Sequence, residues 1–165
     1  SAILFGEDVK FGGVFRCSLD LNQKYGSTEF STPLCVSKVL QGLQLDMRAQ
    51  EQLPLQDVFA DYIFPAFDQI VNEAASFDTE VGMNLIAETD YLIANGAVGH
   101  GAHYHSQSVE GYFAHTPGLV VMIPRSPIQA KGMLLSAIRS KDPVIFLEPK
   151  SLYRIAEEEV PEEDY

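Results

Sequence analysis

Short apolar runs without polar interruption predict strands in four places along the chain. Such runs are typical of strands buried on both faces of a sheet. They lie at residues 1–5, 92–94, 119–123 and 144–147. The run at 92–94 ends a segment from residue 76 whose pattern fits one or two short strands.

Apolar residues spaced three and four positions apart predict helices between these strands. The clearest helix covers residues 61–75, where Asp61 is placed to cap the first turn and Pro65 is tolerated within it. A further helix is expected from about residue 33 to residue 48. Strands and helices are therefore both expected in the first half of the chain.

The second half contains a strand, a helix and a strand in succession. After the strand at 119–123, Ser126 is a typical N-cap and Pro127 suits the first helical position, so a helix is expected to about Ser140. The strand at 144–147 follows after a short turn. This βαβ unit implies a parallel sheet with a right-handed crossover.

The 165 residues are enough for one core and too few for two ordinary domains. We expect an α/β protein, a three-layer α/β/α domain with a mainly parallel sheet, over residues 1–155. Residues 156–165 are expected to be a solvated acidic tail or the start of a linker to a further domain. The abrupt apolar start is typical of a fragment or a processed chain.

Charge is distributed unevenly, and this excludes several functions. The net charge is −12, and the last nine residues hold six acids and no base. Between Arg48 and Arg125 there are ten acids and no Lys or Arg. Binding of nucleic acid through phosphates is therefore not expected, and this stretch cannot hold a diphosphate by itself. No apolar stretch approaches the roughly 20 residues that cross a membrane.

The loop from Asn95 to Ser108 carries three glycines and three histidines after an expected strand end, where ligands bind in parallel sheets. Three interpretations of its histidines stay open. They could bind a metal ion, although no fourth ligand is evident. They could satisfy backbone carbonyls, or one could transfer protons. A hydrolase triad with Ser106 or Ser108 lacks the GxSxG sequence of a nucleophile elbow. The histidines are His100, His103 and His105.

Two other segments are weaker candidates for a site. Glu7 and Asp8 follow the opening strand, where carboxylates can bind or relay protons, although a solvated turn is commoner. Phe59, Tyr62, Phe64 and Phe67 could flank a flat ring. Aromatic residues at helical spacing, however, are more often core or subunit interface.

Seven sequence blocks resemble the beta subunit of branched-chain 2-oxo acid dehydrogenase, in its decarboxylase component. The blocks read FGEDV, FGGVFRC, TPLC, FADYIFPAFDQ, VGHGA, YHSQS and IPRSP, at residues 5–9, 11–17, 32–35, 59–69, 98–102, 104–108 and 123–127. Their spacing is close to that of the family from residue 3 to about residue 161. Pyruvate-type beta subunits fit the FADYIFPAFDQ and VGHGA blocks less well.

The resemblance implies a transketolase-like pyrimidine-binding domain that shares thiamine diphosphate with an alpha subunit. That subunit would supply the diphosphate site and Mg²⁺, in an α2β2 heterotetramer of the mitochondrial matrix or of a bacterial cytoplasm. Family members decarboxylate branched-chain 2-oxo acids and pass the acyl group to a lipoyl-bearing acyltransferase core. Neither nucleic acid nor a membrane is implied.

The resemblance also implies roles for single residues. Leu34 and Tyr62 would touch the aminopyrimidine ring, and His105 would transfer a proton during acyl transfer to lipoyl. Glu7 would belong to an acidic relay between paired cofactors. A K⁺ loop is matched only loosely, around Ala137 to Asp142.

Two cofactor-facing positions depart from the family. Val36 stands where the family has the glutamate that bonds the aminopyrimidine nitrogen, and Val58 stands where a glutamine is usual. Residues 36–57 and 76–97 also diverge. A valine cannot accept the activating hydrogen bond, so the competing hypothesis is a non-catalytic subunit-pairing module of the same fold.

Overall fold

The computed structural model describes residues 2–6, 8–13, 15–25, 53–76, 90–99 and 101–165. Within them the chain forms a parallel sheet with the strand order β1-β2-β3-β5-β4. The strands are β1 (Ala2–Gly6), β2 (Leu53–Phe59), β3 (Asp90–Asn95), β4 (Val120–Met122) and β5 (Val144–Pro149). The expected α/β class with a parallel sheet is confirmed.

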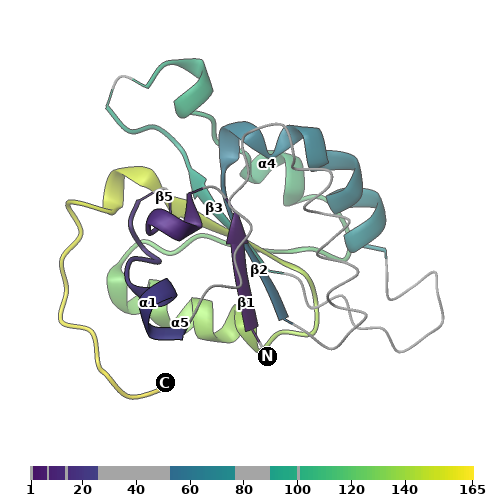
Figure 1. The fold of residues 1–165 in the computed structure, drawn as a ribbon. Helices are drawn as coiled ribbons and strands as arrows, with labels where there is room; N and C mark the ends of the chain where they lie inside the picture. Colours follow the sequence, from purple (N-terminus) through teal and green to yellow (C-terminus); the bar gives the residue numbers. More distant parts are fainter. Residues whose placement is uncertain (1, 7, 14, 26–52, 77–89, 100) are drawn as a thin grey trace.

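The two faces of the sheet are covered by different segments (Figure 1). One face packs against the helical segment 60–75 and α4 (Glu110–Phe113), with Ile70 and Phe113 in the core. The opposite face packs against α5 (Pro127–Ile138). The predicted arrangement of helix, sheet and helix layers is therefore present. The shorter helices near the sheet are η1 (Val9–Phe11), α1 (Leu21–Tyr25), η6 (His103–His105) and η7 (Lys150–Leu152).

The predicted βαβ unit forms as its sequence indicates. The Ser126 hydroxyl accepts a hydrogen bond from the Gln129 amide at 3.5 Å, and Pro127 occupies the first turn of α5. The helix ends at Ile138, slightly before the expected Ser140. β4 and β5 then pair in parallel.

The expectation that the strand at 119–123 is buried on both faces is wrong. β4 covers Val120–Met122, and its residues are only half-buried. It lies at the end of the strand order and pairs with β5 alone among the described strands. An edge strand has a neighbouring strand on one side only. A run of apolar residues does not distinguish such a strand from one in the middle of the sheet.

The expected single helix over residues 61–75 is wrong in its type. The chain instead forms two 3₁₀ turns, η3 (Ala60–Tyr62) and η4 (Phe64–Ala66), followed by a π-helix, η5 (Gln69–Ala74). Asp61 caps nothing, because it lies inside η3 and is buried. The segment nevertheless buries apolar residues as their spacing indicates, since Ile63 and Ile70 are fully buried.

The end of β1 approaches β2 so closely that only glycine fits there. Gly6 has a φ of +148°, and a Cβ at this position would lie 1.9 Å from the carbonyl oxygen of Asp57. L residues with a side chain rarely adopt this conformation. The close approach leads residues 8–20 toward the carboxyl end of β2, where Gly13 lies against the Asp57 carboxylate.

The acidic segment at residues 157–165 lies along α5. Glu158 accepts a hydrogen bond at 2.9 Å from the Ile128 amide in the first turn of this helix. Lys131 donates to the carbonyl oxygens of Glu162 and Glu163 at 3.0 and 2.8 Å. Most of the segment is exposed, as expected, but it is attached to the domain through these contacts.

Some expectations concern residues outside the described ranges. The predicted helix at 33–48 lies there, and so does residue 1 of the opening strand. The domain boundary at residue 155 stays a prediction. Across the described part of the chain, no helix combines the length and the apolarity needed to cross a membrane.

Candidate functional site

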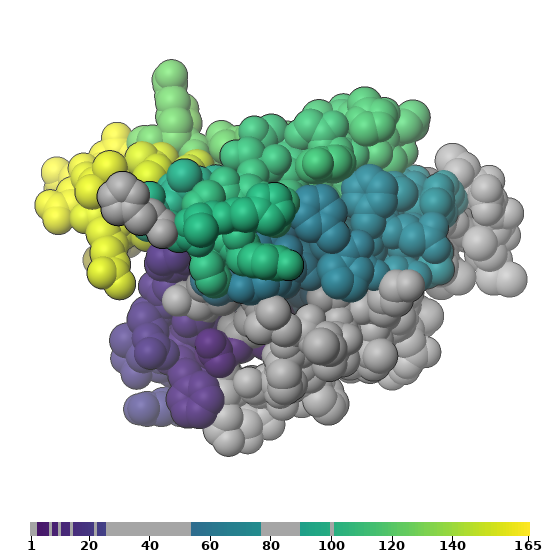
Figure 2. Space-filling view, turned by 90° about the horizontal axis from the view of Figure 1, so that it is seen from above, coloured from purple at the N-terminus to yellow at the C-terminus, as the bar shows by residue number. Residues whose placement is uncertain are grey.

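The carboxyl ends of β2, β3 and β5 lead directly into the segments that form the candidate site. β2 continues into η3, β3 into the loop 96–109, and β5 into η7. These strands are parallel, so their carboxyl ends lie along one edge, where ligands bind in open α/β sheets. Figure 2, seen from above, shows the blue segment 53–76 beside the teal loop, with the yellow C-terminal part next to it.

A buried ion pair joins two of these segments. Lys150 Nζ lies 2.7 Å from Asp61 Oδ2, and both side chains are 0% exposed. The same ammonium group lies 5.0 Å from the centre of the Phe59 ring, a cation–π distance. Charges removed from water need such compensation, because an unpaired buried charge is strongly destabilising.

The loop after β3 is fixed to the site by backbone hydrogen bonds. Gln107 donates its amide to Asp61 Oδ1 at 2.9 Å, and the Gly96 amide donates to the Gln107 carbonyl at 2.9 Å. Lys150 Nζ donates to the His105 carbonyl at 3.1 Å. At the base of the loop, Asn95 Oδ1 accepts from the Val109 amide at 3.0 Å. The loop is therefore anchored at its start, at Gly96, and from His105 to its end.

Aromatic rings surround this anchor. The rings of Phe59, Tyr62 and His105 meet edge to face, with centroids 5.9 to 6.1 Å apart. Phe15 extends the cluster, since its ring meets Phe59 edge to face at 5.9 Å and stacks on Tyr153 at 4.4 Å. His105 is exposed and Tyr62 half-buried, so part of the aromatic surface is open. Such a surface suits a flat ring.

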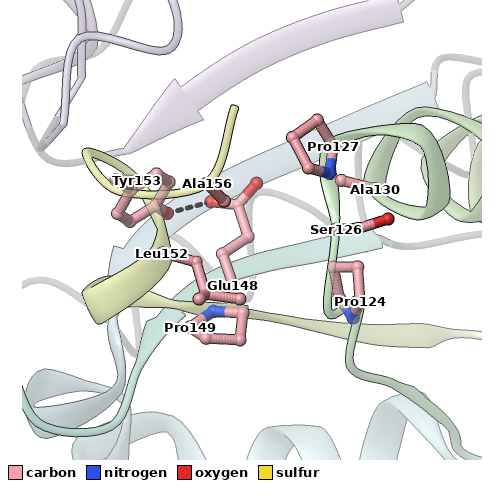
Figure 3. Close-up of a pocket in the computed structure, with 9 residues that line it drawn as sticks. All are labelled: Pro124, Ser126, Pro127, Ala130, Glu148, Pro149, Leu152, Tyr153 and Ala156. Carbon is pink, nitrogen blue, oxygen red and sulfur yellow. Dashed lines mark hydrogen bonds between the residues drawn. The ribbon is translucent and has the colours of Figure 1, made fainter. Parts of the chain in front are cut away.

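A cavity of about 210 Å³ lies between the ends of β4 and β5 and the start of α5 (Figure 3). Its lining is mostly apolar, with the Glu148 carboxylate and the Tyr153 hydroxyl as its main polar groups. Tyr153 donates a hydrogen bond to Glu148 Oε2. Burial raises the pKa of Glu148 despite this bond, and burial and the nearby carboxylate raise the pKa of Tyr153.

The structure brings together two of the residues predicted for the site, Tyr62 and His105. Val58 is 3% exposed and packs in the core beside Ile93, below this surface. Ala137 is buried in α5 and Asp142 is exposed in the turn after it. The predicted residues Glu7, Leu34 and Val36 lie outside the described residues.

The other hypotheses for the histidine loop gain no support from the described residues. No group of three or more His, Cys, Asp or Glu side chains in that part of the chain could hold a metal ion. His103 and His105 are exposed, and His100 lies outside it. Neither Ser106 nor Ser108 makes a side-chain hydrogen bond to a histidine within the described loop.

Two pairs in this region were not predicted from the sequence, Asp61 with Lys150 and Glu148 with Tyr153. One signal was available for the first pair. Asp61 lies inside an apolar segment, and no base occurs between Arg48 and Arg125, so a buried Asp61 requires a cation from outside this stretch. Lys150 directly follows a buried strand.

Comparison with known proteins identifies the family. The model of the transketolase pyrimidine-binding domain matches residues 2–156. The chain belongs to this family. The transketolase pyrimidine-binding domain therefore accounts for nearly the whole described fold, in agreement with the parallel sheet.

Two relatives and one solved structure are similar to this chain. The mitochondrial 2-oxoisovalerate dehydrogenase subunit beta of Dictyostelium discoideum is 56% identical, over 99% of this chain and 45% of its own length. The mitochondrial subunit beta 2 of Arabidopsis thaliana is 53% identical, over 98% and 46%. A solved split gene transketolase, described as an inactive beta4 tetramer, has a TM-score of 0.67 at 14% identity, over 99% of this chain and 49% of its own. The chain spans about half the length of these relatives.

The reactivity of the Cys17 thiol tests the electrostatic effect of the Glu148 and Asp57 carboxylates near this edge of the sheet. Cys17 is exposed, yet loss of water around its thiol, followed by the charges of Glu148 and Asp57, raises its pKa from 9.0 to about 11. We expect alkylation of Cys17 by iodoacetamide at pH 8.5 to be on the order of 10²-fold slower than that of an unperturbed thiol, because the thiolate is the nucleophile. The measurement is the alkylation rate against pH in a Cys35→Ser background.

Glu148→Gln removes one of these negative charges and retains a hydrogen-bond acceptor for Tyr153. The Cys17 pKa should fall, and alkylation at pH 8.5 should become faster. An alkylation rate whose pH profile has its midpoint near 8.5 in the protein that retains Glu148 would contradict this account of the site's electrostatics. A profile that Glu148→Gln leaves unchanged would contradict it as well.

Proposed function

We propose that this chain is the pyrimidine-facing part of a thiamine-diphosphate-dependent beta subunit, from the decarboxylase component of a branched-chain 2-oxo acid dehydrogenase. The reaction is oxidative decarboxylation of 2-oxo acids with acyl transfer to lipoyl. Two observations support this proposal. Beta subunits named for 2-oxoisovalerate dehydrogenase match the chain over almost its whole length. Tyr62 and His105 meet at the carboxyl edge of the sheet.

The described residues fit one half of the coenzyme. The open aromatic surface of Tyr62, Phe59 and His105 suits the flat aminopyrimidine ring. The stretch that carries this aromatic surface offers the diphosphate no cation, because no Lys or Arg occurs between Arg48 and Arg125, and Lys150 beside it is already paired with Asp61. When bound, thiamine diphosphate supplies the nucleophilic carbon for decarboxylation.

The chain's own residues would orient the ring and handle a proton. Tyr62, with Leu34, would contact the aminopyrimidine, and Val58 would support that surface from the core. The exposed imidazole of His105 can exchange a proton with a substrate, and this fits proton transfer during acyl transfer to lipoyl. Glu7 would belong to the acidic relay between paired cofactors.

The missing half of the site implies a partner. An alpha subunit would hold the diphosphate and Mg²⁺ in an α2β2 heterotetramer, and a lipoyl-bearing acyltransferase core would receive the acyl group. The K⁺ loop near Ala137 and Asp142 stays a prediction. The relatives from Dictyostelium and Arabidopsis are named as mitochondrial, which supports the mitochondrial matrix as the location.

One observation favours a second candidate function. Val36 occupies the position of the activating glutamate, and a valine side chain accepts no hydrogen bond. Loss of a positioned acid or base costs roughly 10²- to 10⁴-fold in rate. A chain with Val36 could therefore serve as a subunit-pairing module that does not catalyse.

Binding of thiamine diphosphate separates the two candidates. We expect saturable binding in calorimetry only when the full-length protein is assembled with an alpha-type partner. In that assembly, Tyr62→Ala should raise Kd roughly 2- to 12-fold, because aromatic contacts contribute about 0.5–1.5 kcal/mol.

Tyr104→Ala is the matched control, because Tyr104 is exposed in the same region and its ring contacts His103. It should leave Kd unchanged. Absence of binding with and without the partner would favour the pairing module over the enzyme subunit.

Restoring the acid at position 36 tests the assignment of that position. Val36→Glu in the complete assembly should raise decarboxylation by roughly 10²- to 10⁴-fold, because the carboxylate supplies the missing hydrogen bond to the ring nitrogen. The measurement is carbon dioxide release at saturating coenzyme. Val36→Gln, similar in size but unable to ionise, should give far less gain, and unchanged turnover in Val36→Glu would count against the assignment.

A further inference from the structure

The Asp61–Lys150 pair is placed where an ion pair contributes little to stability. Both side chains are 0% exposed, so both lose hydration on folding. Replacing such pairs with apolar residues of similar volume is often neutral or stabilising. Stability alone is therefore a weak reason for an ion pair at this position. The hydrogen bonds that the pair makes to the loop after β3 suggest a different role.

Each member of the pair holds a backbone group of the same turn. Lys150 Nζ donates to the His105 carbonyl at 3.1 Å, and Asp61 Oδ1 accepts from the Gln107 amide at 2.9 Å. The two held groups lie two residues apart in the chain. The carboxylate uses its other oxygen, Oδ2, for the lysine, so the three interactions form one continuous network.

The held turn directs the imidazole of His105 outward. Its backbone is fixed from below, while its exposed ring contacts only the edges of Phe59 and Tyr62 among the described aromatic rings. Phe59 also lies against the Lys150 ammonium at 5.0 Å. The pair therefore touches the backbone of His105 and one of its ring neighbours, but not the imidazole itself.

We propose that Asp61 and Lys150 are positioning residues that set the location of the His105 imidazole for proton transfer. This role rests on the proposed function, which gives His105 its part in acyl transfer to lipoyl. Displacement of a catalytic group by about 1 Å can cost on the order of 10²-fold in rate. The pair acts through His105 and makes no contact with the substrate.

The test uses a variant that leaves no buried charge unpaired. Asp61→Asn together with Lys150→Met removes both charges, keeps an oxygen acceptor for the Gln107 amide, and removes the donor to the His105 carbonyl. The full-length protein is assembled with its alpha-type partner, and two half-reactions are followed in single turnover. These are decarboxylation with a chemical electron acceptor and acyl transfer to a lipoyl domain. Lys24→Met, at an exposed lysine of α1, is the control.

We expect the paired variant to slow acyl transfer by on the order of 10²-fold and to leave decarboxylation largely unchanged. Adding His105→Ala to the paired variant should cause little further loss, because the same step is already impaired. Equal losses in both half-reactions, or losses that add with that of His105→Ala, would show a general structural role and overturn the proposal.

Failure of the proposed function is recognised separately. If His105→Ala alone leaves acyl transfer unchanged, the role of His105 in the proposed function is wrong. Positioning is then judged by amide hydrogen exchange over residues 103–108 in the assembled protein. Faster exchange in the paired variant, but not in Lys24→Met, sustains the positioning of this turn, and unchanged exchange overturns it.

Discussion

Two opposite charges excluded from water constrain the carboxyl edge of this domain. The attraction between Asp61 and Lys150 stabilises the fold only if the remaining hydrogen-bonding capacity of both groups is satisfied. That requirement is met by the turn at His105 and Gln107. Segments that follow three different strands must therefore be in place together, and the aromatic surface above them takes its shape from this arrangement.

Under the proposed function this domain provides only half of the coenzyme site. The scarcity of Lys and Arg side chains in the stretch that carries the aromatic surface explains why. The region between Arg48 and Arg125 offers aromatic rings, a histidine and backbone groups, which suit a flat, weakly charged ring. Lys150, whose ammonium lies against the Phe59 ring, is already paired with Asp61. A ligand with both a flat ring and a diphosphate then requires a second polypeptide at its charged end, as the proposed function states.

The strands and the helix start that were predicted correctly are those whose signal lies within a few neighbouring residues. β1, β3 and β5 are short apolar runs, and the start of α5 follows from Ser126 and Pro127. β2 was missed because Gln56 and Asp57 interrupt its apolar run, yet both are buried, and the Gln56 amide atoms have no hydrogen-bond partner among the described residues. Burial of such polar residues depends on neighbours distant in sequence.

The candidate site could be predicted only in part, because it also combines residues that are distant in the sequence. Tyr62 and His105 were named through a family resemblance, and their 6.0 Å separation agrees with a shared surface. The cap expected at Asp61 was wrong because its carboxylate pairs with a lysine 89 positions later, which no periodicity encodes. The cluster around Glu148 and Tyr153 was missed because residues on β5 and after it meet only in the folded chain.

The most direct measurement is an experimental structure of the full-length protein, assembled with an alpha-type partner and thiamine diphosphate. The account predicts the aminopyrimidine within contact distance of Tyr62, about 4 Å, with the His105 imidazole facing the same cleft and the diphosphate on the partner. A coenzyme ring bound away from this aromatic surface, with Tyr62 and His105 facing no shared cleft, would contradict it.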